Sequence, residues 1–129
     1  MRGSQALIID DNVQNVSILS HLLSNEGVNS ILVTNPSKLD AMLNQAGDVC
    51  VIFLDLEMPG ASGFDVLKKL KADATFSQVP VIAYTVHVSE MQVAYDYGFD
   101  GFLGKPLDAD KFPDQLARIL NGEGVWDNH

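Results

Sequence analysis

The sequence predicts an α/β domain built on a doubly wound, five-stranded parallel sheet with five helices. Five short apolar runs alternate with five stretches whose apolar residues recur at helical spacing. The runs are continuous, as in strands that are covered on both faces. Strict alternation of strand and helix implies parallel strands joined by right-handed crossovers. Five such units in 129 residues favour the strand order 2-1-3-4-5.

The predicted strands coincide with the apolar runs. The third run is the longest and most apolar, and the fifth is the weakest. Pro80 stands just before the fourth run, a position where a strand tolerates proline. In chain order the predicted strands are residues 6–9, 30–33, 49–54, 81–84 and 102–103.

The predicted helices are marked by apolar stripes, which we interpret as core packing. Pro36 is expected to open the second helix and Ser89 to cap the fourth. Glycines are expected to end four of the helices, at Gly27, Gly47, Gly98 and Gly122. The stripes are Val16, Leu19, Leu22 and Leu23; Leu39, Met42, Leu43 and Ala46; Val66, Leu67 and Leu70; Val93, Ala94 and Tyr97; and Phe112, Leu116, Ile119 and Leu120.

Composition and charge narrow the class of protein. A hydrophobic share of 47% and a charged share of 19% are typical of a folded globular domain and exclude intrinsic disorder. No apolar run approaches the roughly 20 residues of a membrane-spanning helix. The net charge of −9 argues against direct binding to nucleic acid or to an anionic membrane. It is compatible with a basic protein partner or a divalent cation.

The ends of the chain are predicted to lie outside the domain. We place the domain at residues 5–121, interpret residues 1–4 as a cloning remnant, and expect residues 122–129 to form a flexible tail. No apolar segment of a secretory signal follows Met1. The single cysteine, Cys50, fits a reducing compartment, so we expect a cytoplasmic protein.

Polar residues follow four of the predicted strands at their carboxyl ends. Asp10 and Asp11 follow the first strand, and Asp55 follows the third. Thr85 follows the fourth, and Lys105 follows the fifth. Ligands of an open α/β sheet bind beyond the carboxyl ends of the strands, where the strand order reverses. Each residue alone has an ordinary explanation, such as helix capping. Together they predict one crevice in which the three aspartates meet.

Electrostatics then predicts a cation and a phosphoryl group. Two carboxylates about 4 Å apart repel by roughly 4 kcal/mol at a moderate effective dielectric constant. Three in one crevice therefore require a proton or a cation, and an all-oxygen site suits Mg²⁺. Asp55 is the candidate nucleophile because it ends the central strand, which leaves Asp10 and Asp11 to hold the metal. The ammonium of Lys105 and the hydroxyl of Thr85 would hold phosphoryl oxygens.

Two further features surround this predicted crevice. The turn-rich run Met58-Pro59-Gly60, with Gly63, lets the backbone approach a ligand beside Asp55. The Lys105-Pro106 bond favours a cis peptide, which would aim the lysine inward.

These residues resemble the receiver domain of two-component response regulators, from about Gln5 to Asn121. The resemblance implies a flavodoxin-like fold and a domain that becomes phosphorylated on an aspartate. It rests on the pair Asp10-Asp11, the segment Leu54-Asp55-Leu56-Glu57-Met58-Pro59 with Gly63, Thr85, and Lys105-Pro106.

The resemblance implies a role for each acidic residue. Asp55 would be the phospho-acceptor, Asp11 a direct Mg²⁺ ligand, and Asp10 the holder of a metal-bound water. Glu57 would offer its backbone carbonyl to the metal.

It also implies a switch. Lys105 would pair with the phosphoryl group, Thr85 would move to bond it, and Phe102 would fill the space that Thr85 leaves. The surface of the fourth helix, fifth strand and fifth helix would then change. Val86 replaces the small residue usual in the family, and Glu57 and His87 occupy positions that tune dephosphorylation. We interpret His87 as an exposed loop residue.

The implied partners are a sensor histidine kinase or a histidine phosphotransfer protein, together with a downstream protein target. The domain would be a monomer or a phosphorylation-linked homodimer, and we expect no turnover of a separate substrate. The main alternative is a small Mg²⁺-dependent phosphatase of the haloacid dehalogenase type, for which Glu57 is an imperfect acid/base. A flavodoxin-like FMN binder is disfavoured because no phosphate loop follows the first strand. An interaction module that has lost phosphorylation is disfavoured by the intact set of five residues.

Overall fold

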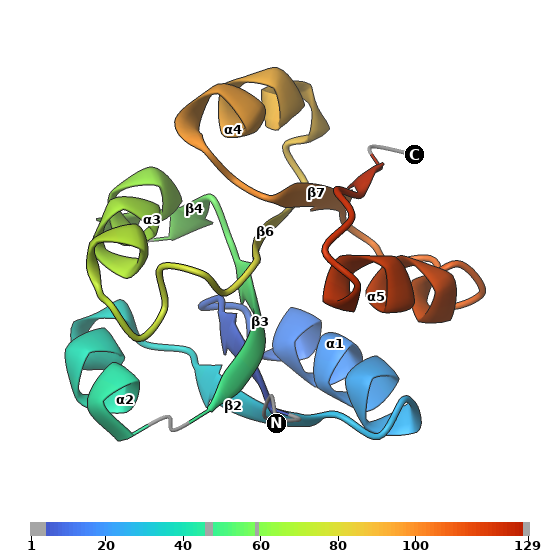
Figure 1. The fold of residues 1–129 in the computed structure, drawn as a ribbon, viewed down its shortest axis with the longest axis horizontal. Coiled ribbons are helices and arrows are strands. Elements are labelled where there is room, and N and C mark those ends of the chain that lie inside the picture. Colours follow the sequence, from blue (N-terminus) through green and yellow to red (C-terminus); the bar gives the residue numbers. More distant parts are fainter. Residues whose placement is uncertain (1–4, 46–47, 59, 128–129) are drawn as a thin grey trace.

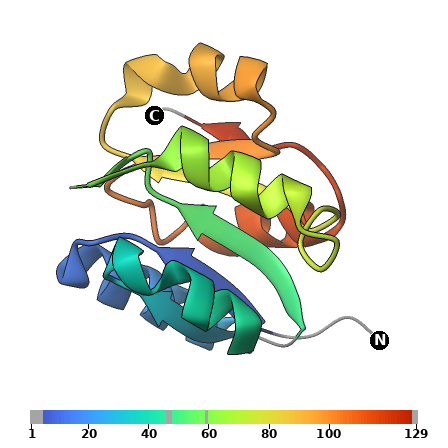
Figure 2. The same ribbon diagram turned by 90° about the vertical axis from the view of Figure 1, so that its left-hand side faces the viewer.

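A computed structural model of the chain describes residues 5–45, 48–58 and 60–127. Helices cover both faces of a central parallel sheet, as predicted (Figures 1 and 2). Within the described residues the sheet has six strands, in the order β2-β1-β3-β6-β7-β8. The first five of these reproduce the predicted order 2-1-3-4-5. The strands are β1 (Gln5–Ile9), β2 (Asn29–Val33), β3 (Val49–Leu54), β6 (Val81–Thr85), β7 (Gly101–Gly104) and β8 (Trp126–Asp127).

Five α-helices and two short 3-10 turns lie within the described ranges. The α1 and α5 helices cover one face of the sheet, and α2, α3 and α4 cover the other (Figure 1). The helices are α1 (Val13–Asn25), α2 (Leu39–Gln45), α3 (Gly63–Ala72), α4 (Met91–Tyr97) and α5 (Phe112–Leu120); the 3-10 turns are η1 (Pro36–Lys38) and η2 (Val88–Glu90).

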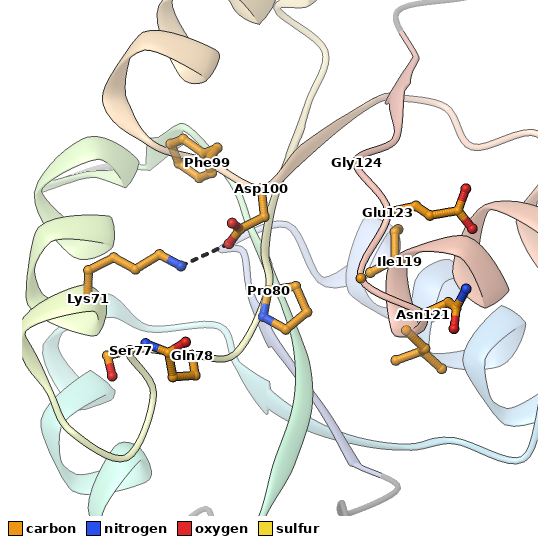
Figure 3. Close-up of a pocket in the computed structure, with 12 residues that line it drawn as sticks. Lys71, Ser77, Gln78, Pro80, Phe99, Asp100, Ile119, Asn121, Glu123 and Gly124 are labelled. Atoms are coloured by element: carbon orange, nitrogen blue, oxygen red, sulfur yellow. Dashed lines mark hydrogen bonds and ion pairs between the residues drawn. The ribbon is translucent and has the colours of Figure 1, made fainter.

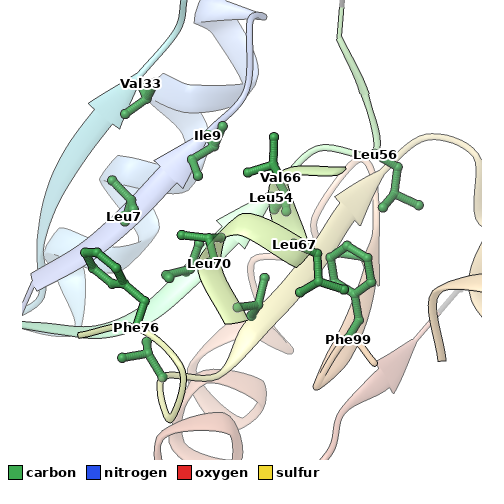
Figure 4. Packing of buried hydrophobic residues seen from close by; sticks show 14 of the residues in the cluster. Leu7, Ile9, Val33, Leu54, Leu56, Val66, Leu67, Leu70, Phe76 and Phe99 are labelled. Carbon is green, nitrogen blue, oxygen red and sulfur yellow. The ribbon is translucent and has the colours of Figure 1, made fainter. Parts of the chain in front are cut away.

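The hydrophobic core has two halves, one on each face of the sheet. The central strand β3 is buried along its whole length and supplies both halves. Ile52 and Leu54 pack toward α3, while Val51 and Phe53 pack toward α1 and α5. This alternation follows from the pleat of a strand, in which successive side chains point to opposite faces. Figure 4 shows the first half, in which side chains of α3 meet those of β1 and β3.

The fourth helix differs from its prediction. Only Ala94 of its stripe is buried, whereas Val93 and Tyr97 are 44% and 56% exposed. Ser89 does not cap this helix, because it lies in η2 and the helix begins at Met91. A helix of seven residues makes too few turns to bury a broad stripe, so a single small residue carries its contact with the core.

Residues 122–127, which belong to the predicted tail, lie against the sheet in the structure. Gly122, at φ +89°, turns the chain back toward the sheet, and the chain then forms β8 beside β7. Val125 is buried just before this strand. A strand of two residues leaves no periodic pattern, so composition alone suggested a tail. Residues 1–4 and 128–129 lie outside the described residues.

A short antiparallel hairpin that the sequence did not predict follows β3. It pairs β4 (Glu57–Met58) with β5 (Ala61–Ser62). Pro59 of the predicted turn, and Ala46 and Gly47 at the predicted end of α2, lie outside the described residues. Among the helices described, none has the length and apolar character needed to span a bilayer.

Candidate functional site

The register of the sheet brings the three aspartates together. Ile9 and Leu54 are register partners in β1 and β3, so Asp10 and Asp55 leave neighbouring strands at the same level. The backbone N–H of Asp55 donates to the carbonyl of Ile9 at 2.9 Å. One carboxylate oxygen from each of Asp10, Asp11 and Asp55 lies within 4.8 Å of the others. The carboxyl edge of the sheet therefore holds a tight cluster of acids.

Lys105 inserts its ammonium into this cluster. It follows β7, its backbone N–H donates to the carbonyl of Thr85, and its bond to Pro106 is cis. Nζ lies 2.6 Å from Oδ2 of Asp10 and 3.8 Å from Oδ2 of Asp55. The side chains of Lys105 and Asp10 are only 5% and 0% exposed. Water screens such a pair poorly, so these charges interact strongly.

Asp55 is the group whose protonation is most altered. The pKa of its carboxyl is raised from 3.8 to about 7, because burial and the negative charge of Asp10 together outweigh the lowering by Lys105 and by the N–H of Glu57. One ammonium does not balance three carboxylates, so the cluster favours a bound proton near neutrality. A cation at the cluster would relieve the same repulsion.

The loop after Asp55 is drawn close by hydrogen bonds and by a glycine. The N–H of Glu57 donates to Oδ1 of Asp55 at 3.3 Å. A Cβ at Gly63 would lie 2.5 Å from the backbone oxygen of Asp55, so only glycine fits there. Ser62 caps α3 by accepting from the N–H of Phe64. The hairpin and the start of α3 thus fix the backbone on which Asp55 is presented.

The first loop fixes Asp10 in a similar way. Oδ1 of Asp10 accepts a hydrogen bond from the N–H of Asn12 at 2.9 Å. The side chain of Asn12 caps α1 by accepting from the N–H of Asn15. Oδ2 of Asp10 is left to face Lys105.

Thr85 and its neighbours form the opposite wall. Thr85 is fully buried at the end of β6, and its hydroxyl oxygen accepts from the N–H of His87 at 3.1 Å. Nε2 of His87 lies 2.8 Å from Oε2 of Glu57, with both side chains about half exposed. His87 is an exposed loop residue, as interpreted from the sequence, and the structure adds its pairing with Glu57. The Glu57 carboxylate is therefore directed toward His87.

Phe102 and Tyr84 lie beneath this surface. Phe102 is fully buried in β7 and belongs to the core half that contains Ala94. Tyr84, the residue before Thr85, is not among the site residues predicted from the sequence. Nζ of Lys105 lies 4.5 Å from the centre of its ring. Burial and the charges of Asp10 and Asp55 raise the pKa of the Tyr84 hydroxyl, so it stays neutral. An aromatic residue directly before the predicted hydroxyl residue was the available signal.

Two cavities differ in their chemistry. The cavity over the acidic cluster has a volume of about 370 Å³ and is lined by Asp11, Asn12, Asn15, Asp55, Glu57, Val86, His87 and Lys105. A larger cavity of about 600 Å³ lies near the amino ends of β6 and β7 (Figure 3). Lys71 and Asp100 line the larger cavity and pair with each other at 2.8 Å. The smaller cavity gathers carboxylates, an ammonium and a backbone turn, and these can hold a cation and an anionic group together.

Sequence comparisons connect this site with known proteins. Residues 6–117 match the family model of the response regulator receiver domain. The chain is 32% identical over 125 residues to a nitrate/nitrite response regulator protein homolog of Haemophilus influenzae, covering 96% of this chain and 53% of that protein. It spans about half the length of curated relatives of this kind.

Structural comparisons show that the fold is shared. The chemotaxis protein CheY4 of Vibrio cholerae has a TM-score of 0.80 at 23% identity, with 91% of this chain and 98% of that chain covered. The receiver domain of the sensor histidine kinase PA1611 of Pseudomonas aeruginosa was solved with a magnesium ion coordinated in its active-site cleft. Its TM-score is 0.77 at 21% identity, with 92% of this chain and 98% of that chain covered.

Proposed function

Because this chain belongs to the family of response regulator receiver domains, we propose that Asp55 is the residue on which it accepts a phosphoryl group. Receiver domains of two-component systems are phosphorylation-accepting modules. The carrying observation is the position of Asp55 in the crevice. Its carboxylate lies among those of Asp10 and Asp11, and Lys105 approaches within 3.8 Å. The neighbouring carboxylates can bind a cation, and the Lys105 ammonium can attract an incoming anionic group to Asp55.

The acidic cluster fits a magnesium ion. Its donors are carboxylate oxygens from three residues, and Mg²⁺ prefers oxygen ligands that it shares with a phosphate. Asp10, Asp11 and Asp55 would hold the ion, together with the backbone carbonyl of Glu57. When bound, the ion supplies neutralisation of the charge on the carboxylates and on the phosphoryl oxygens. The magnesium ion of the Pseudomonas aeruginosa receiver domain supports this assignment.

The transfer reaction uses the Asp55 carboxylate as the nucleophile. One of its oxygens attacks the phosphorus of a phosphohistidine on a partner protein, and an O–P bond forms as the P–N bond breaks. The electron pair of that bond leaves with the imidazole, which takes up a proton. Lys105, whose Nζ lies 3.8 Å from Oδ2 of Asp55, then pairs with the phosphoryl oxygens. The product is an acyl phosphate on Asp55.

The phosphorylated domain then changes state. The Thr85 hydroxyl, now bonded to the N–H of His87, turns to the phosphoryl group. Phe102 fills the space that Thr85 vacates, and the surface formed by α4, β7 and α5 is altered. Such a switch requires two conformations of similar free energy, and the contacts made by the phosphoryl group shift the equilibrium toward one of them.

The partners follow from this chemistry. A sensor histidine kinase or a histidine phosphotransfer protein donates the phosphoryl group, and a downstream protein reads the altered surface. The net charge of −9 disfavours direct contact with nucleic acid or membrane. We place the protein in the cytoplasm, as a monomer or a phosphorylation-linked homodimer.

The comparisons give no support to the phosphatase alternative. Glu57, its candidate acid/base, is instead paired with His87. The domain loses its own phosphoryl group by hydrolysis and turns over no separate substrate.

Intact-mass measurement tests the proposal. The protein is incubated with Mg²⁺ and acetyl phosphate, alongside Asp55→Asn and, as a matched control, Asp40→Asn at an exposed position. The wild type and Asp40→Asn should gain one phosphoryl group, and Asp55→Asn should gain none. An adduct that persists in Asp55→Asn, or no adduct in the wild type, would contradict the assignment. Sustained hydrolysis of phosphoesters would instead support the phosphatase.

A further inference from the structure

The Lys105 ammonium rests on the face of an aromatic ring. Nζ lies 4.5 Å from the ring centre of Tyr84, and both residues are almost completely buried. The face of an aromatic ring attracts a cation, most strongly where water is excluded. The Lys105 ammonium therefore contacts both the Tyr84 ring and the Asp10 carboxylate, whose Oδ2 lies 2.6 Å from Nζ.

We propose that Tyr84 is a positioning residue for phosphoryl transfer to Asp55, acting through Lys105. Its ring holds the ammonium between Asp10 and Asp55, so that the ammonium can pass from Asp10 to the phosphoryl oxygens without losing its aromatic contact. This inference rests on the proposed function. An ammonium has three N–H donors, so Lys105 can keep its contact with the ring while it donates to phosphoryl oxygens.

The ring rather than the hydroxyl carries this role. The Tyr84 hydroxyl donates to the carbonyl of Asn15 at 3.5 Å, which is the outer limit of a hydrogen bond. It points toward α1 and not toward Asp55. Phenylalanine should therefore replace Tyr84 with little loss, and leucine should not.

The test compares Tyr84→Phe with Tyr84→Leu. Phosphorylation by acetyl phosphate and Mg²⁺ should proceed in Tyr84→Phe within about twofold of the wild-type rate and fall roughly tenfold in Tyr84→Leu, as expected for a buried cation–π contact. The NMR signals of the Lys105 Cε protons should show an upfield ring-current shift in the wild type and in Tyr84→Phe. That shift should disappear in Tyr84→Leu.

Equal phosphorylation rates in the leucine and phenylalanine variants would overturn the proposal, whether both rates match the wild type or both are reduced. Absence of the ring-current shift in the wild type would overturn it as well. A wild type that forms no adduct but shows the ring-current shift would refute the proposed function, and with it a role of Tyr84 in transfer, while the contact itself stands.

A second, independent observation concerns the outer edge of β7. Residues 124–127, here called the strap, add β8 to this edge (Figure 1). The N–H of Phe102 donates to the carbonyl of Val125 at 2.8 Å. A Cβ at Gly101 would lie 2.8 Å from the same carbonyl oxygen, so the strap is seated where β7 carries no side chain.

Side chains hold the strap at both flanks. The ring of Trp126 meets that of Tyr95 on α4 edge to face, with centres 5.2 Å apart. The side-chain amide of Gln115 on α5 donates to Oδ2 of Asp127 at 2.7 Å. Nζ of Lys111 lies 3.8 Å from the same Asp127 oxygen. The strand has two residues, both only partly buried, which is typical of a segment that opens locally without unfolding of the domain.

We infer that the strap reports the state of Asp55 by loosening from β7 when that residue is phosphorylated. Phe102 and Trp126 are register partners, so their side chains lie on the same face of neighbouring strands. Phe102 belongs to the buried cluster against which Trp126 packs, so movement of Phe102 toward Thr85 would alter the support of Trp126. Release of the strap then uncovers the edge of β7. This inference also rests on the proposed function.

Trp126 is the single tryptophan of the chain, so its fluorescence reports on the strap alone. With Mg²⁺ and acetyl phosphate, we expect its emission to shift to the red and hydrogen exchange at the Phe102 amide to rise several-fold. Neither change should occur in Asp55→Asn. In Gln115→Glu, a carboxylate would face Asp127, and exchange at Phe102 should be raised before phosphorylation; Asp114→Asn, at an exposed neighbouring position, should behave as the wild type.

A phosphorylated protein, verified by intact mass, whose Trp126 emission and Phe102 exchange are unchanged would overturn the strap proposal and leave the proposed function standing. Unchanged exchange in Gln115→Glu would overturn the contact on which it depends. A protein that gains no phosphoryl group would overturn both.

Discussion

The two edges of the central sheet each carry a cavity and a lysine–aspartate pair, yet they differ in what surrounds the charges. At the amino edge, Lys71 and Asp100 line the larger cavity, and their side chains are 32% and 42% exposed (Figure 3). At the carboxyl edge, Lys105 lines the smaller cavity, and the side chains of Lys105 and Asp10 are almost completely buried. Water therefore screens the first pair and hardly screens the second.

The partners of each pair explain the difference. Asp100 also accepts a hydrogen bond from the N–H of Val81, so it ties the start of β6 to the turn before β7. This is a structural contact. Asp10 shares its lysine with Asp55 and sits beside Asp11, which leaves an excess of negative charge. Neither the volume of a cavity nor the presence of an ion pair marks a site here; a buried imbalance of charge does.

The largest predicted contrast is in the two lysines. Without Mg²⁺ at pH 7, Lys105→Met should lower the free energy of unfolding by about 3 kcal/mol, because it leaves buried carboxylates without a counter-charge. Lys71→Met should lower it by less than about 1 kcal/mol, because its pair is exposed. Urea unfolding measures both values. Equal losses would remove the distinction between the two edges.

The next contrast is in pH dependence. The folded-state pKa of Asp55, about 7, exceeds the ordinary 3.8, so between these values the folded state binds more protons than the unfolded state. Stability without metal should therefore rise as the pH falls from 8 to 5, by roughly 1 kcal/mol per pH unit at the steepest. The difference between the wild type and Asp55→Asn isolates this contribution. If stability relative to Asp55→Asn fell on acidification, the sign would be wrong.

Magnesium should act at the carboxyl edge alone. At a concentration of ten times its dissociation constant, Mg²⁺ should stabilise the wild type by about 1.4 kcal/mol. Asp11→Asn should largely lose this effect, whereas Asp100→Asn, at the other edge, should keep it. Thermal unfolding with and without Mg²⁺ measures the three proteins. Retained stabilisation in Asp11→Asn would show that the ion binds elsewhere.

The smallest effect on stability is expected at the rim of the carboxyl edge. His87 and Glu57 are paired but about half exposed, so His87→Ala should change the free energy of unfolding by less than about 0.5 kcal/mol. The lifetime of the phosphoryl group on Asp55 in His87→Ala should differ from that in the wild type by a few-fold, because His87 and Glu57 line the cavity over Asp55. A large loss of stability in chemical denaturation would mean that this rim is part of the core.

Much of the carboxyl edge could be predicted from the sequence, because position along a strand determines position in a parallel sheet. Continuous apolar runs located the strands, and the residue that follows a run must lie at the carboxyl edge. Asp10, Asp55 and Lys105 were found in this way. The prediction needed no side-chain detail, only the strand order.

The rest depends on contacts that no local pattern encodes. In the sequence, Tyr84 is indistinguishable from the other apolar residues of its strand. Its role depends on Lys105, which is distant in the chain but lies over the ring in the fold. The strap was missed because a two-residue strand has no period, and its seat at Gly101 exists only once β7 is in place. The exposure of Tyr97 depends on how far α4 stands from the sheet, which an apolar stripe does not specify.

The most direct test of the account is the location of the phosphoryl group. After incubation with acetyl phosphate and Mg²⁺, reduction with borohydride converts a phosphorylated aspartate to homoserine, which peptide mass spectrometry can place in the sequence. The buried excess of charge around Asp55 predicts homoserine at residue 55 and at neither Asp10 nor Asp11. Homoserine at Asp10 or Asp11, or an unmodified residue 55 in protein that carries the phosphoryl group, would contradict it.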